Sequence, residues 1–376
     1  MSQINIRNLS NENDDGSPEI VGVSTFSATS FFVPPKGTTA ERPSDCEPGS
    51  IRFNTDTLNL EYFRGKTLGW SQFELVTPNL GGGTGSNTGL GVRGLFAGGL
   101  SPSLSDVIDF LTISTLGDTQ DFGDISAGKQ SMSAVGSRTR ALNIGGYTTG
   151  FENEIEFVTF ASQGNITDFG NLTSNKNRTA SCSDQVRGIT GGGNPNTNVI
   201  EYVTIAQTGN GVDFGDLTVA RQSAGSFSSS TRGVFAGGYI EPTYSDTIDY
   251  ITISSTGNAI DFGNLTSIRM YMGSSSNSTR GVMGGGNGAS RTNTIEFVTI
   301  ASKSDATNFG DLTSARTDLA GASSPTRAVF VSGDTPTLVN TIDFVEILTT
   351  GDAVDFGDQT TKRDRPSGCS NGHGGL

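Results

Sequence analysis

The sequence predicts an all-β protein built mainly from a repeated four-stranded unit. An Asp-Phe-Gly or Asn-Phe-Gly triplet occurs six times, and its phenylalanines are 47, 45, 48, 47 and 47 residues apart. Hydrophobic residues make up only 33% of the 376 residues, whereas glycine contributes 52 of them. A composition rich in glycine, serine, threonine and asparagine suits short strands joined by turns better than it suits helices.

The Asp-Phe-Gly triplet also occurs in protein kinases, where its aspartate holds a magnesium ion. A kinase carries the triplet once, behind a catalytic loop, so six copies at a fixed period indicate a structural repeat instead. We therefore expect the aspartates to serve as turn or strand-end acceptors. They are Asp121, Asp168, Asp213, Asp261 and Asp355, with Asn308 at the sixth position.

Each repeat contains four candidate strands. A segment of small residues such as SAGSFSSS, from Ser223, is placed first and innermost, because small side chains suit strands that crowd around an axis. An arginine then opens an apolar run that ends in glycines, such as RGVFAGG from Arg232. The third strand, such as IDYITI from Ile248, is apolar on both faces and is expected between two layers. A Gly-Asn or Gly-Asp turn, typical of a tight hairpin, leads to the triplet strand.

Length varies in one interval of the repeat. The distance from the arginine to the isoleucine of the third strand is 13 to 16 residues, whereas that isoleucine always lies 14 residues before the phenylalanine. The loops between the second and third strands are therefore our candidate recognition face. Their aromatic residues either stack on sugar rings or pack within their own loops. The candidate ligand-binding residues are Tyr147, Phe151, Tyr239, Tyr244 and Arg291.

The two ends of the repeated region complement each other. The first repeat starts at Arg93 without a small-residue strand, and such a strand stands near the end of the sequence, from about Ser367 to Gly372. This strand is expected to pair with the strand from Arg93 and to close a ring. Four strands per repeat and this closure predict a six-bladed β-propeller over residues 93–376.

The order of these features resembles the kelch repeat, in which an innermost small-residue strand, a glycine doublet and aromatic third and fourth strands recur. The sequence departs from kelch where phenylalanine replaces the usual tryptophan and where the last doublet is Ser332-Gly333. The resemblance covers residues 93–376 and implies a kelch-like propeller closed by a C-terminal inner strand.

Residues 1–78 are of a different kind, and the stretch NLGGGTGSNTGLGV, residues 79–92, has the composition of a flexible linker. Around TDT, the segments SIRFN and LNLEYF alternate apolar with polar residues, which predicts a β-hairpin with an aromatic face on which Trp70 packs. A unit this small is expected to lean on a partner or on copies of itself. The residues assigned to this attachment module are Phe53, Tyr62, Phe63 and Trp70.

The GSIRFNTDTLNLEYF…W pattern resembles the N-terminal modules of bacteriophage tail fibres and other virion appendages, notably of cyanophages, over residues 20–80. This resemblance implies attachment to other virion proteins, a homo-oligomer in which a trimer is one option, assembly in a bacterial cytoplasm and a final location in the virion.

Repeated polar residues have a bland and a sharp interpretation. The third-strand acids and the strand-opening arginines could line a ligand-binding channel, but identity in every blade favours structural pairs. Cys182 and Cys369 fall in the inner strand and are expected to be small core residues. With one histidine and no nucleophile motif, the sequence predicts no enzyme, no catalytic or metal site and no cofactor. The acids are Asp109, Glu156, Glu201, Asp249, Glu296 and Asp343.

The charge balance narrows the partners. With 24 basic and 38 acidic residues the net charge is −14, which repels nucleic acids and anionic membranes. No apolar run of membrane-spanning length occurs, so no membrane insertion is expected. The function expected from the sequence is a virion structural protein, a tail fibre or appendage, whose propeller recognises a host-surface glycan. Two alternatives are a capsid or tail decoration protein and an intracellular kelch-type scaffold for protein interactions.

Overall fold

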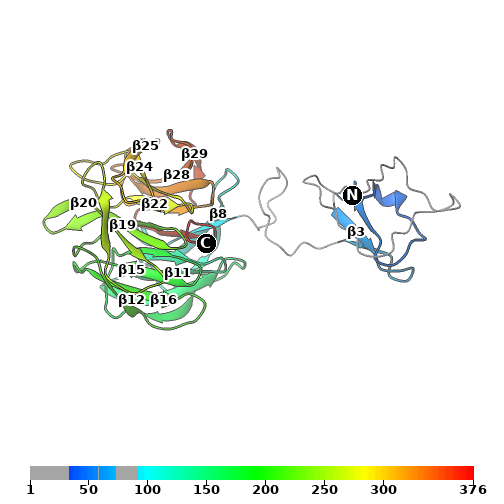
Figure 1. Ribbon diagram of the computed structural model, residues 1–376, viewed down its shortest axis with the longest axis horizontal. Helices are drawn as coiled ribbons and strands as arrows, with labels where there is room; N and C mark the ends of the chain where they lie inside the picture. The colour runs from blue at the N-terminus through cyan, green and yellow to red at the C-terminus, as the bar shows by residue number, and fades with distance from the viewer. Residues whose placement is uncertain (1–33, 58, 73–91) are drawn as a thin grey trace, which may run out of the picture. The chain divides into compact units, whose positions relative to one another are not determined.

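A computed structural model describes residues 34–57, 59–72 and 92–376. The chain divides into two compact units, residues 1–77 and residues 78–376, and each is considered by itself (Figure 1). Of the expected linker, residues 79–92, only Val92 belongs to the described residues. The described chain is almost entirely β-structure, as the sequence predicts, and its one helix is the 3-10 turn η1 (Thr39–Glu41).

The N-terminal unit contains one four-stranded sheet in the order β1-β2-β3-β4. The predicted hairpin is confirmed, because Ile51 faces Tyr62 and Phe53 faces Leu60 in an antiparallel register. The first strand joins this hairpin in the parallel sense. The strands are β1 (Lys36–Gly37), β2 (Ile51–Asn54), β3 (Asn59–Phe63) and β4 (Trp70–Gln72).

Six further four-stranded sheets, all antiparallel, follow between residues 93 and 370, and we number them 1 to 6 in chain order. Sheet 1 contains β30 (Ser367–Ser370), β5 (Arg93–Ala97), β8 (Val107–Thr112) and β9 (Gln120–Asp124). Sheet 2 contains β10 (Ser133–Gly136), β11 (Arg140–Tyr147), β12 (Phe151–Thr159) and β13 (Thr167–Asn171). Sheet 3 contains β14 (Ala180–Ser183), β15 (Arg187–Gly191), β16 (Val199–Thr204) and β17 (Val212–Asp216).

The second half of the ring repeats this pattern. Sheet 4 contains β18 (Gly225–Ser228), β19 (Arg232–Ile240), β20 (Thr243–Thr252) and β21 (Ile260–Asn264). Sheet 5 contains β22 (Gly273–Ser276), β23 (Arg280–Gly284), β24 (Thr294–Thr299) and β25 (Thr307–Asp311). Sheet 6 contains β26 (Ala320–Ser323), β27 (Arg327–Asp334), β28 (Leu338–Glu346) and β29 (Val354–Asp358). A small ribbon of β6 (Leu100–Ser101) and β7 (Ser103–Leu104) lies within the loop of sheet 1.

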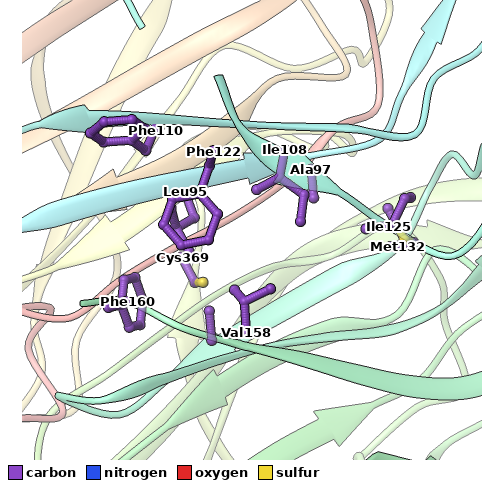
Figure 2. Close-up of a cluster of buried hydrophobic side chains, with 11 residues drawn as sticks. Leu95, Ala97, Ile108, Phe110, Phe122, Ile125, Met132, Val158, Phe160 and Cys369 are labelled. Carbon is purple, nitrogen blue, oxygen red and sulfur yellow. The ribbon is translucent and has the colours of Figure 1, made fainter. Parts of the chain in front are cut away.

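Hydrophobic cores lie between consecutive sheets. Figure 2 shows the core between sheets 1 and 2, where Phe110 and Phe122 of one sheet share a cluster with Val158 and Phe160 of the next. Equivalent clusters follow in chain order, and another joins Phe96 of sheet 1 to Phe330's neighbour Val329 of sheet 6. Each sheet is therefore covered on both faces, as the apolar third strands predict.

The expected pairing of the C-terminal strand is confirmed. Ser367 faces Ala97 and Cys369 faces Leu95, so β30 completes the sheet that begins at Arg93. The inner strand β30 packs beside both β10 and β26. The sequence predicts six blades, and the structure has seven four-stranded sheets: six from residues 93–370, in a propeller-like arrangement, and the N-terminal one.

The Asp-Phe-Gly triplet has a packing explanation in every sheet. Its phenylalanine meets the aromatic ring of the third strand edge-on, with centroids 5.8–6.0 Å apart. Its glycine lies against the neighbouring sheet: a Cβ on Gly263 would stand 2.4 Å from the carbonyl oxygen of Ser304. The aspartates are exposed on the fourth strand.

The tight hairpin predicted between the third and fourth strands is wrong. In sheet 4 the connection spans residues 253–259. Its Gly257 donates from N to the carbonyl of Phe214 at 2.7 Å, and Asn258 Oδ1 accepts from the Asp216 backbone N at 3.1 Å. The Gly-Asn pair therefore serves to join this sheet to the preceding one, which requires a longer loop than a two-residue turn.

Candidate functional site

The third-strand acids are structural. Each forms an ion pair inside its own sheet with a basic residue that stands seven positions after the triplet phenylalanine. Arg221 and Asp249, 2.9 Å apart, are both fully buried. Burial lowers the pKa of Arg221, and Asp249 opposes that effect. Burial alone would raise the pKa of Glu201, but hydrogen bonds from Lys176 and Thr173 bring it below its ordinary value. The basic partners are Lys129, Lys176, Arg221, Arg269, Arg316 and Arg363.

The strand-opening arginines have a different role. Each guanidinium lies over the aromatic ring of its own third strand, with its carbon 4.5–5.1 Å from the centroid. Each also donates to a backbone carbonyl of a neighbouring sheet, as Arg232 does to Ile300 at 2.9 Å. These arginines brace the ring from outside the channel and do not pair with the acids.

The inner strands line a channel that is filled at one end. Ser228, Ser276 and Ser323 at the ends of their strands each donate to the carbonyl of the preceding inner strand at 2.7 Å. In sheet 2 that position is Gly136, and its carbonyl accepts from His373 Nε2 at 2.8 Å. The nitrogen Nδ1 of His373 accepts from the Gly375 backbone at 3.1 Å, which fixes a neutral imidazole.

The two cysteines of this region are buried among these strands, as expected. Both Cys182 and Cys369 lie along the channel, beside His373 and the rows of serines. Burial raises the pKa of each thiol to about 12. They are packing residues rather than reactive thiols.

The four candidate aromatic residues form two cross-strand pairs. Tyr147 faces Phe151 across β11 and β12, with ring centroids 5.9 Å apart. Tyr239 faces Tyr244 across β19 and β20 at 5.8 Å. All four are half-buried, so each ring packs on its partner and still presents a surface to solvent. The fifth candidate, Arg291, is exposed and forms an ion pair with Asp334 of the adjoining hairpin.

At the end of the channel opposite His373, the structure brings together six residues that we call the mouth residues. Their backbones form a closed cycle of hydrogen bonds, each N–H donating to the carbonyl of the preceding mouth residue at 2.8–3.1 Å. All six have positive φ, between 54° and 61°. They are Ser131, Arg178, Ser223, Tyr271, Asp318 and Arg365.

The mouth residues surround a cavity of about 110 Å³. Met132, Met272 and Leu319 also line it and give it an apolar part. Backbone bridges from Gln130 to Tyr147 and from Gln222 to Tyr239 connect the mouth to both aromatic hairpins. The mouth and the aromatic pairs therefore belong to the same face of the ring.

Sequence reasoning missed the mouth residues, although a signal exists. Each stands nine residues after a triplet phenylalanine, as Ser131 follows Phe122. The position is fixed in spacing but differs in residue type, whereas the positions around it repeat. A fixed position with variable chemistry is the pattern expected of a recognition residue on a rigid scaffold.

The N-terminal module differs from its prediction in one respect. Phe63 and Trp70 pack together at 5.4 Å, but Phe53 and Tyr62 lie on the other face of the sheet. The predicted single aromatic face is wrong, because successive residues of a strand point to opposite faces. Trp70 is further held by Nε1, which donates to the Pro43 carbonyl at 2.9 Å.

The inner face of this module is polar. Glu61, fully buried, accepts from Arg42 Nε at 3.1 Å and from Asn54 Nδ2 at 2.7 Å. Hydrogen bonds from Arg42 lower the pKa of Glu61. The apolar residues Ile51 and Leu60 are left on the other face, where they are 49% and 42% exposed.

Comparison with known proteins gives no relative: no family model matches the chain, and no curated protein matches it. Among residues 34–57, 59–72 and 92–376, no three His, Cys, Asp or Glu side chains are placed to hold a metal ion. Within the same ranges no helix has the length and apolar character of a membrane span.

Proposed function

We propose that the chain is a non-enzymatic virion structural protein, a tail fibre or similar appendage. Its six sheets would be the blades of a kelch-like propeller that is displayed for recognition of a bacterial surface glycan. Residues 1–78 would attach the protein to other virion proteins and to copies of itself. The observation that carries this proposal is the difference between the two ends of the channel.

One end is filled and the other is open. His373 and the glycines around it occupy the end near Gly136, and a Cβ on Gly375 would stand 1.8 Å from the Ser183 carbonyl oxygen. The opposite end carries a cavity, six dissimilar side chains and two half-exposed aromatic pairs. Sugar rings bind to concave sites that combine aromatic or apolar surfaces with a few polar groups.

The N-terminal sheet supports attachment or oligomerisation. Ile51, Phe53, Leu60 and Tyr62 share one face through the register of β2 and β3. A sheet of four short strands buries little apolar surface by itself, and an apolar face that remains exposed favours association. Replacing both Phe53 and Leu60 by serine should reduce the oligomer size measured by light scattering, whereas Leu116→Ser, at an exposed leucine of the ring, should not.

The experiment that tests the proposal is gold labelling of purified phage particles with an antibody raised against residues 93–376. Label at the tips of tails or fibres would support recognition of the host. Label spread over the capsid would favour a decoration protein instead. Protein found only in the infected cytoplasm, with no label on particles, would favour the intracellular scaffold and contradict the virion assignment.

A further inference from the structure

We infer that the channel mouth binds the carboxylate of an acidic sugar, with Arg178 as the residue that receives it. This inference rests on the proposed glycan recognition and specifies its substrate class. Its starting point is the backbone of the mouth residues, which a search of the rest of the described chain does not match for cost.

Seven non-glycine residues of the described chain have positive φ, and six of them are the mouth residues. The left-handed conformation costs roughly 1–2 kcal/mol for a residue with a Cβ, and glycine avoids this cost. None of the six positions is glycine, although glycine is abundant elsewhere in every repeat. Backbone strain of this kind is retained mainly where the side chain has a function.

The six side chains are not interchangeable packing groups. Two are serines and two are arginines, with one tyrosine and one aspartate, so no single residue type is required by the backbone cycle. Arginine and tyrosine are among the residues least often found at positive φ. Arg178, Tyr271 and Arg365 are therefore the strongest candidates for a role in binding.

One arginine is anchored and the other is available. Arg365 donates from Nε to Asp318 at 3.1 Å and from Nη1 to Gln130 Oε1 at 3.0 Å. Arg178 has no ion pair among the described residues, and its buried Nε lacks a hydrogen-bond partner. Its guanidinium lies over the ring of Tyr271, 5.2 Å from the centroid.

A planar guanidinium whose face is covered binds through its edge, and a carboxylate matches that edge in two parallel hydrogen bonds. The ion pair with Arg365 neutralises Asp318, so the lining retains the charge of Arg178. This positive charge sits in a chain of net charge −14, which disfavours anions elsewhere on its surface.

Size and lining favour a sugar acid over a larger anion. The cavity of about 110 Å³ is smaller than a site for a drug-sized ligand, so it admits the terminal unit of a longer molecule. Met132, Met272 and Leu319 supply an apolar surface for the C–H face of a sugar ring, and Ser131, Ser223 and Tyr271 supply hydroxyl groups for its own hydroxyls. The aromatic pairs on the same face would contact the following units.

The test is a titration of the full-length protein with glucuronate by calorimetry, with glucose and acetate as the neutral and non-sugar comparisons. Glucuronate should bind at least about ten-fold more tightly than either, because each lacks one half of the recognised chemistry. Arg178→Gln should weaken glucuronate binding roughly ten- to a hundred-fold, and Arg178→Lys should restore part of it. Arg138→Gln removes an equal charge at an exposed turn and should leave binding unchanged.

Equal affinity of wild type and Arg178→Gln for glucuronate, with both folded by circular dichroism, would overturn the inference. A peptide with a free C-terminal carboxylate that binds more tightly than glucuronate would also overturn it, because the ligand would then be a protein terminus. The titration uses no virus particle. Glucuronate binding together with absence from particles would therefore contradict the virion proposal while supporting the site.

Discussion

Two rings of residues, one inside the sheets and one at the channel mouth, follow the same 47-residue period and behave in opposite ways. The buried acid–base pairs repeat the same chemistry in all six sheets, always an Asp or Glu with an Arg or Lys. The mouth residues share a backbone conformation but differ in chemistry from sheet to sheet. Repetition of the side chain therefore identifies what packing requires, and variation at a fixed backbone identifies what packing leaves free.

The largest expected effect comes from breaking a buried pair. Asp249→Asn should lower the free energy of unfolding by about 3–5 kcal/mol, because Arg221 would remain buried without its countercharge. The measurement is urea denaturation followed by circular dichroism. Asp261→Asn is a matched control, since Asp261 faces Asp249 in the register but is exposed, and it should change stability by no more than about 0.5 kcal/mol. Similar losses in both variants would contradict the structural role of the pair.

A smaller effect is expected at the contact between sheets. Gly257→Ala and Gly263→Ala place a Cβ at the same φ of 154°, but only the second meets a neighbour, the Ser304 carbonyl oxygen at 2.4 Å. Backbone strain should cost each variant about 1–2 kcal/mol, and Gly263→Ala should cost measurably more. The difference in thermal midpoint between the two variants isolates the clash. Equal midpoints would show that the neighbouring sheet moves away without penalty.

Removing a mouth side chain should have little effect on stability. Ser131→Gly relieves the left-handed strain and adds freedom to the unfolded chain, so the two contributions oppose each other. Its free energy of unfolding should stay within about 1 kcal/mol of wild type by urea denaturation. A loss as large as that of Asp249→Asn would place the mouth residues with the packing residues and remove the contrast between the rings.

The mildest probe changes no residue and compares the channel interior with the rest of the chain. The pKa of Cys182 and Cys369 is raised to about 12, from a model value of 9.0, so at pH 8 both remain protonated thiols in the folded protein. Iodoacetamide labelling should be blocked at both sites until denaturant is added. Mass spectrometry of the labelled peptides measures this. Rapid labelling of Cys182 in the native protein would indicate that the channel opens.

Much of the ring could be predicted from the sequence because the signals are local. The apolar run from Ile248 to Ile253 identifies a covered strand by itself, and the small residues of the first strand indicate where strands crowd. The partner of Arg93's strand was also predictable, because a repeat that lacks one strand at its start and carries a spare strand at its end can close in one way. The basic partners of the acids, seven residues after each phenylalanine, were present in the spacing but were not recognised.

By itself, therefore, the sequence determined the all-β class, the period, the order of strands and the strand that completes sheet 1, since these depend on hydrophobic pattern and spacing within about 50 residues. Tertiary structure alone decided which side chains meet at the axis. Arg178 and Tyr271 are separated by two repeats, and their contact depends on the closure of the ring and on a backbone conformation that no residue type there announces. The same holds for His373, whose place against Gly136 requires the whole ring to be formed.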